Sequence, residues 1–287
     1  MARIAPFGHC TLRRRAGGEA RLLIGKARES KRRSAAVTPV ALLAALALAR
    51  GALAGETRCW IDKGALVAPV AFGDIAGDFL IDLSAPASAL HVTRAQEDGL
   101  DGEAATRDLS IAGRRLAGVT LAIVDLDVRT AKFDTTINGV IGADLLRRFV
   151  VEIDPSPCRL RLLRRRPARW AGSVRLAIRE ADGRPLAPAS VTDGLKVRSG
   201  LFALGTADWA TRVNGRLSRP QTTDAPAPVR LRALEIAGRL FEQVPAATQP
   251  QAIGEARGAI GMAVWSRWRL RLDMREGWLE LAPADGK

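Results

Sequence analysis

The chain has 287 residues, of which 47% are hydrophobic, and carries a formal charge of +14 at pH 7. That hydrophobic content is enough for one large core or two small ones, and it excludes a chain that is disordered throughout. The charge would ordinarily suggest a nucleic-acid or membrane partner, but residues 1–54 carry +9 of it and leave +5 for the rest. No basic stripe interleaved with aromatic residues follows residue 54, which argues against nucleic acid as a partner.

The first segment of the chain has the pattern of an export signal. Basic residues at 31–33 precede an apolar run at 40–49, and a small-x-small cleavage pattern follows at 52–54. The apolar run is too short to span a bilayer comfortably, so we expect cleavage after Ala54 rather than a stable transmembrane anchor. The sequence therefore predicts a targeting segment at residues 1–54 and an exported protein, periplasmic or secreted. The start codon and the export route stay open.

The cysteines are interpreted in the light of export. Cys10 would leave with the signal, so Cys59 and Cys158 would remain as an even pair in an oxidising compartment. We predict a disulfide between them, with two separately buried thiols as the alternative. His91 is the only histidine after residue 54, and no cluster of Cys and His has the spacing of metal ligands. No metal and no cofactor is therefore expected.

Beyond the signal, the pattern is mainly that of β-strands. Short alternating or β-branched stretches are punctuated by Gly, Pro and Asp, and few long amphipathic windows occur. The Pro- and Arg-rich stretch at 163–172 indicates a boundary. We expect strands at 65–73, 78–84, 119–126, 149–154 and 159–163, and a short helix at 142–149.

An internal repeat is the most informative feature of the sequence. Residues 139–163 align without a gap to residues 258–282, and residues 111–116 resemble residues 236–241. The matches include two Gly–Gly pairs, an Arg, an Asp and an aromatic position. The repeat predicts two duplicated lobes, residues 55–166 and 167–287.

The order of these features resembles the retropepsin-like and pepsin-like aspartic proteases, in the version found in exported bacterial proteins. The resemblance depends on the strand that runs into Asp82 and on the segment "GVIGADLLRRFVVEID" at 139–154. It implies a mainly β chain of two lobes, each a β-barrel with short helices and each contributing an Asp-Thr-Gly or Asp-Ser-Gly turn. In that family two aspartates about 3 Å apart share one proton, so that one activates a water and the other polarises the scissile carbonyl.

The first-lobe turn departs from the family pattern. Asp82 stands at the position of the catalytic aspartate, but Leu83 replaces the hydroxyl residue and Ser84 replaces the glycine. Ala85 matches the family. An alternative role for Asp82 is structural, as a carboxylate that caps its own turn by accepting backbone N–H groups.

The second-lobe turn departs further. Aligning Ala207 with Ala85 places Leu204 where the second aspartate is expected. A shifted alignment could offer Asp208 instead, although Trp209 would then disrupt a turn of small residues. The chain contains no Tyr, so the flap tyrosine that is common in the two-lobed enzymes is missing.

Three functions are compatible with these residues. The first is a catalytically impaired aspartic-protease-like protein whose inter-lobe cleft binds an extended peptide or envelope ligand. The second is an active aspartic endopeptidase that uses Asp82 with an unrecognised partner or as a homodimer. The third is a non-enzymatic basic module that binds the cell envelope. Leu204 favours the first, and a monomer is expected, with a homodimer as the alternative.

Overall fold

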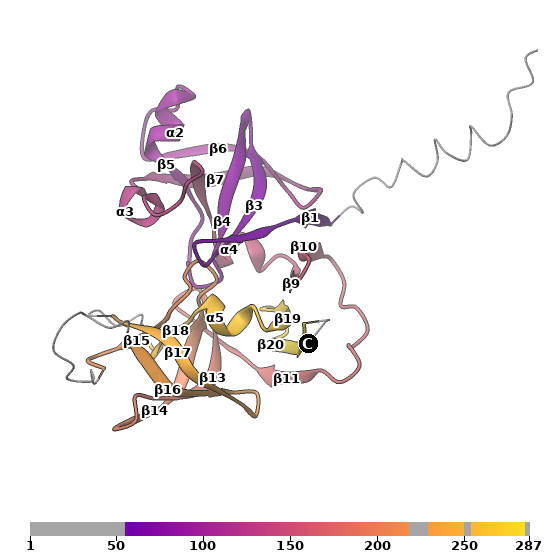
Figure 1. The fold of residues 1–287 in the computed structure, drawn as a ribbon. Helices are drawn as coiled ribbons and strands as arrows, with labels where there is room; N and C mark the ends of the chain where they lie inside the picture. Colours follow the sequence, from indigo (N-terminus) through magenta and orange to yellow (C-terminus); the bar gives the residue numbers. More distant parts are fainter. Residues whose placement is uncertain (1–54, 218–228, 250–253, 285–287) are drawn as a thin grey trace, which may run out of the picture. The chain divides into compact units, whose positions relative to one another are not determined.

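A computed structural model describes residues 55–217, 229–249 and 254–284, all of which belong to one structural unit (Figure 1). The predicted targeting segment at 1–54 lies outside the described residues. Within the described ranges, none of the helices has the length and apolar character needed to cross a membrane.

The first lobe is a closed seven-stranded sheet, drawn in indigo to magenta in Figure 1. Its strand order is β2-β3-β4-β8-β5-β7-β6, and β3 also pairs with β6, which closes the sheet. Apolar side chains of β3 and β4, such as Phe72 and Phe79, are fully buried inside it. The strands and helices are β2 (Trp60–Asp62), β3 (Ala65–Phe72), β4 (Ile75–Ile81), β5 (Ala89–His91), α2 (Val92–Glu97), β6 (Ala104–Ile111), β7 (Arg114–Val124), α3 (Asp127–Thr130), β8 (Ile137–Ile141) and α4 (Ala143–Leu146).

The second lobe repeats this topology strand for strand. Its order is β12-β13-β14-β18-β15-β17-β16, and β13 also pairs with β16. The mainly β architecture of two duplicated lobes is therefore confirmed. The elements are β12 (Arg179–Ala181), β13 (Arg184–Thr192), β14 (Val197–Leu204), β15 (Thr211–Asn214), β16 (Arg230–Ile236), β17 (Arg239–Gln249), β18 (Gly258–Ile260) and α5 (Met262–Trp265).

The hairpin turns are repeated as well. Ala112–Gly113 in the first lobe and Ala237–Gly238 in the second both have positive φ at their two residues. Lys63–Gly64 and Asp182–Gly183 form a second equivalent pair with the same property. Two successive positive φ values are typical of the tight turns whose twist matches that of the flanking strands. The equivalent turns fix equivalent registers in the two lobes.

A third sheet joins the lobes. Its order is β1-β10-β9-β19-β20-β11, and the antiparallel pair of β9 with β19 brings the two halves together. The predicted boundary at 163–172 runs from the last residue of β10 through the segment that leads to β11. The strands are β1 (Glu56–Arg58), β9 (Val150–Pro155), β10 (Cys158–Leu163), β11 (Val174–Ala177), β19 (Trp268–Asp273) and β20 (Trp278–Pro283).

A row of alternating charges crosses this shared sheet from edge to edge. Neighbouring members lie directly opposite each other on adjacent strands, and each neighbouring pair forms an ion pair. Opposite charges directly across two strands stabilise their pairing. We call this row the charge ladder; in sheet order it consists of Glu56, Arg161, Glu152, Arg271, Glu280 and Arg175.

The ladder carries buried charge at its centre. Glu280 is fully buried, and Glu152 and Arg271 are nearly so. Burial alone would raise the pKa of Glu280, but hydrogen bonds from the Ser173 hydroxyl and the Trp170 N–H, together with the charge of Arg271, outweigh it and hold that pKa below its ordinary value. The carboxylate of Glu280 is therefore kept ionised inside the sheet.

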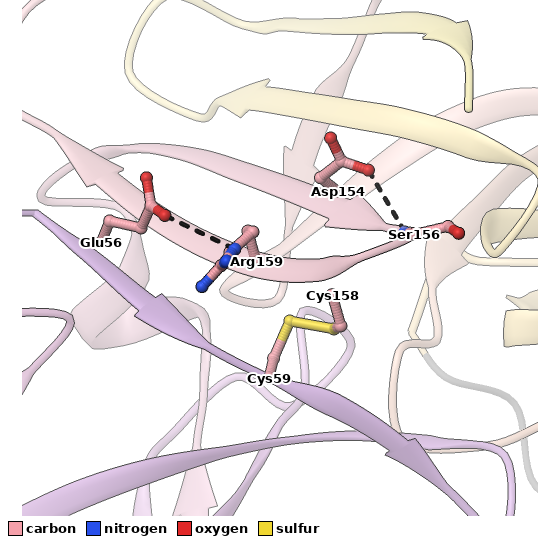
Figure 2. The surroundings of a disulfide bond; sticks show 6 residues. All are labelled: Glu56, Cys59, Asp154, Ser156, Cys158 and Arg159. Atoms are coloured by element: carbon pink, nitrogen blue, oxygen red, sulfur yellow. Dashed lines mark hydrogen bonds and ion pairs between the residues drawn. A yellow bond between two sulfur atoms is a disulfide. The ribbon is translucent and has the colours of Figure 1, made fainter. Parts of the chain in front are cut away.

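Figure 2 shows that Cys59 and Cys158 form a disulfide, the pairing that the cysteine count predicts. Cys59 lies between β1 and β2, and Cys158 begins β10. The Cys59 N–H also donates to the Cys158 carbonyl at 3.2 Å. The bond therefore ties the start of the first lobe to the shared sheet.

Candidate functional site

The lobes meet at two tight turns, each of which follows a central strand. The Asp82 N–H donates to the Ile141 carbonyl at 3.0 Å, and the Gly205 N–H donates to the Ile260 carbonyl at 2.8 Å. Ile141 ends β8 and Ile260 ends β18, which are equivalent strands of the two lobes. Asp82 and Gly205 are therefore the equivalent residues of the two turns.

This equivalence corrects the expected counterpart of Asp82. Leu204 is the last residue of β14 and is fully buried in the core, one position before the turn. Matching Ala207 to Ala85 shifts the alignment by one residue. The structural match of Ala85 is Asp208. The Ala85 carbonyl accepts the first N–H of α4 at 2.8 Å, and the Asp208 carbonyl accepts the first N–H of α5 at the same distance. Gly205, which has no side chain, stands at the position of the second aspartate.

Thr206 connects the two turns and is the equivalent of Leu83. Its hydroxyl donates to the Ile81 carbonyl at 2.6 Å and accepts the Leu83 N–H at 3.0 Å. The side chain is almost fully buried. Leu83 has no hydroxyl with which to make the reciprocal contacts, so the side-chain link between the turns comes from the second lobe alone.

Replacing Thr206 with valine is expected to lower the free energy of unfolding by about 1–3 kcal/mol, because the Leu83 N–H and the Ile81 carbonyl would stay buried without this partner. Urea denaturation measures the change. Thr206→Ser keeps the hydroxyl and is the matched control, for which we expect a smaller loss. Equal destabilisation by Val and Ser would contradict a role for the hydroxyl.

Asp82 is engaged on both carboxylate oxygens and is 3% exposed. Its Oδ1 accepts the N–H of Ser84 at 2.8 Å and the hydroxyl of Ser84 at 2.6 Å. Its Oδ2 forms an ion pair with the Arg129 guanidinium. Asp82 therefore does cap its own turn, and in addition it neutralises a cation.

Arg129 was not identified from the sequence, because it lies on α3, in a connecting segment whose length differs between the two halves of the repeat. The first-lobe segment between β7 and β8 covers residues 125–136, whereas the equivalent second-lobe segment between β17 and β18 covers residues 250–257. The same loop supplies Lys132, whose ammonium lies 3.3 Å from the Ala207 carbonyl. The difference in length between the two segments is the sequence feature that could have indicated Arg129, because extra residues beside the turns can place additional side chains there.

Two further cations contact these turns. Arg184 of β13 donates through Nε to the Ser84 carbonyl at 2.8 Å. Asp208 pairs with Arg212 at 2.8 Å and with Lys132 at 3.4 Å. Both acids at the turns are thus paired with cations.

This arrangement differs chemically from a pair of carboxylates that share a proton. Such a pair needs two acids close enough that both cannot ionise, and here Asp82 has Arg129 as its ionic partner while glycine stands at the equivalent position. Among the described residues, no group of three or more His, Cys, Asp or Glu could hold a metal ion.

A pocket that is open to solvent lies elsewhere, on the second lobe. It is lined by residues of β11, β13, β14, β16 and the β16–β17 turn, including Ser190, Gly200 and Glu235. None of the turn residues described above lines it.

Comparison with known proteins supports the fold assignment. No family model matches the sequence, and no curated protein matches it. Among solved structures, an aspartic proteinase from Irpex lacteus matches with a TM-score of 0.52 and 12% identity, covering 81% of this chain and 98% of that chain. At this identity the match shows the fold alone, which is the two-lobed fold of the aspartic proteinases.

Proposed function

We propose that this protein is an exported, aspartic-protease-like protein that does not hydrolyse peptides and that binds an extended peptide in a cleft between its lobes. The observation that carries the proposal is the pairing of Asp82 with Arg129 where a proteinase of this fold would set two carboxylates together. Export is supported by the signal pattern at 1–54 and by the disulfide.

The absence of hydrolysis follows from the charges at the turns. A water attacking a peptide carbonyl needs one carboxylate as a base and one carboxylic acid to polarise the carbonyl. Because Gly205 has no side chain, the second turn supplies no carboxylic acid that could polarise the carbonyl. Both carboxylate oxygens of Asp82 already accept hydrogen bonds. A homodimer that paired Asp82 with its copy would have to displace the turn that Thr206 already links to Leu83.

Peptide binding needs neither carboxylate. An extended peptide is held by backbone hydrogen bonds and by pockets for alternate side chains. Beside the turns, Trp209 is 44% exposed, and Val128 of α3 is fully exposed immediately before Arg129. These apolar groups support contact with the side chains of a peptide.

The test is to incubate the purified protein with a diverse peptide library between about pH 3 and 7, the range in which carboxyl groups titrate, and to measure both cleavage and binding. We expect binding without cleavage, for the protein and for Asp82→Asn alike. Cleavage that Asp82→Asn abolishes would establish an active endopeptidase instead. A protein that neither cuts nor binds peptides would refute the proposed binding function.

A further inference from the structure

We propose that the junction of the two turns binds a carboxylate of the peptide, either a free C-terminus or an acidic side chain. The inference rests on the proposed function, since it names the chemical group that the peptide presents at this place. The cations that would hold the carboxylate are Arg129, Lys132 and Arg184.

The charge at the junction is positive. Two acids, Asp82 and Asp208, lie at the turns and are both paired with cations. Four cations contact the same turns, namely Arg129, Lys132, Arg184 and Arg212. The turns and their direct partners therefore carry an excess of two positive charges, which favours an anionic group in the ligand.

The cations also have hydrogen-bond donors to spare. A guanidinium has five N–H donors and an ammonium has three. Arg129 uses one donor on Asp82. Arg184 uses its Nε on the Ser84 carbonyl and its Nη1 on the Asp182 carbonyl, at 3.5 Å, which leaves three N–H donors. The contacts of Lys132 are long, at 3.3 and 3.4 Å. The side chains of Arg129 and Lys132 are also 36% and 38% exposed, so a ligand can reach them.

Each of these three cations occurs in one lobe only, and the repeat does not supply it twice. Arg129 and Lys132 lie in the longer loop of the first lobe. Arg184 directly follows the Asp182–Gly183 turn, and the equivalent position after Lys63–Gly64 is Ala65. The first lobe therefore forms this hairpin without a cation, so the repeated fold does not itself require the charge of Arg184, which is free to serve a bound carboxylate.

Carboxylates suit this set of donors. Guanidinium groups bind carboxylates through two parallel N–H···O bonds, and hydrogen bonds between charged groups are stronger than those between neutral ones. The exposed Trp209 next to Asp208 would contact the residues that flank the carboxylate.

The experiment measures binding of the full chain to labelled peptides by fluorescence anisotropy at low salt. One pair of peptides differs only in a C-terminal carboxylate or amide, and a second, amidated pair differs only in an internal Asp or Asn. We expect one pair to show about tenfold tighter binding of the charged member, the loss typical of a removed charged hydrogen bond. The pair that shows it identifies the source of the carboxylate.

The variants Lys132→Gln and Arg184→Gln are each expected to reduce that preference. Arg129 is left intact, because its removal would leave Asp82 buried without a cation. Arg94→Gln on α2 is the matched control: it also removes one positive charge, but from a residue whose partner is Glu97, and it should keep the preference. If charged and neutral peptides bind equally, the carboxylate site is wrong while peptide binding stands. If no peptide binds, both proposals fail.

Discussion

Replacing Arg271 with methionine is expected to lower the free energy of unfolding by about 3–5 kcal/mol, the usual loss when one member of a buried ion pair is removed. Arg271 pairs with Glu152 at 2.9 Å and with Glu280 at 3.0 Å, and its guanidinium lies 3.9 Å from the centre of the Trp170 ring. Methionine fills much of the same volume but leaves two buried carboxylates without their common cation. Denaturation in guanidinium chloride measures the change.

The matched control is Arg159→Met on β10. Arg159 also pairs with a glutamate of the shared sheet, Glu56, but at 3.6 Å and with its side chain 34% exposed. We expect a loss of no more than about 1 kcal/mol, as for exposed ion pairs. Similar losses in the two variants would show that burial in the charge ladder does not determine the effect.

The pH dependence gives a second readout for Arg271→Met. The pKa of Glu280 is lowered in the folded protein, so its contribution to stability is present above the unfolded value of 4.5 and is lost as the pH falls through the folded value. Arg271 helps to lower that pKa. The variant should therefore lose this contribution at a higher pH than the parent protein.

Reduction of the disulfide is expected to lower the free energy of unfolding by about 2–5 kcal/mol. Cys59 and Cys158 are 99 positions apart in sequence, and closing a loop of that length restricts the unfolded chain strongly. The measurement is the shift in denaturation midpoint on adding dithiothreitol, with the double variant Cys59→Ser/Cys158→Ser as a reference.

Dithiothreitol should shift the midpoint of the parent protein and leave that of the double variant unchanged. Thiol titration of the unfolded, unreduced protein supplies an independent measurement, in which we expect neither Cys59 nor Cys158 to react. Two reactive thiols in that titration would contradict the pairing.

The strand pattern and the repeat were predictable because both can be recognised from short stretches of consecutive residues. Alternating or β-branched stretches predicted β3 and β9 to within one residue at each end, and glycine recurs at the second position of the equivalent turns. The register of the second turn was not predictable from letter matches. Ala207 resembles Ala85, but the register is defined by the hydrogen bonds of Asp82 and Gly205 to the ends of β8 and β18, and these contacts join residues that are far apart in sequence.

The site chemistry was predicted in part. The strand that leads into Asp82 was predicted, although it ends at Ile81 and not at residue 84. The cap that Asp82 forms on its own turn was one of the two roles considered for it. Its ionic partner was not predicted, because Arg129 lies 47 positions away on the short helix α3. The ladder also escaped detection, since equivalent residues of opposite charge, such as Glu152 and Arg271, count as mismatches in an alignment.

Those mismatches have a consequence for how the halves recognise each other. In a symmetric pair of two identical lobes with this register, the residue at the centre of the β9–β19 pair would meet its own copy, so a glutamate there would face a second glutamate and an arginine a second arginine. Either encounter would place like charges in the middle of a buried sheet, which is costly. The observed pairing sets Glu152 opposite Arg271. Duplication supplied two similar halves, and divergence of their charges has made each half the complement of the other rather than of itself.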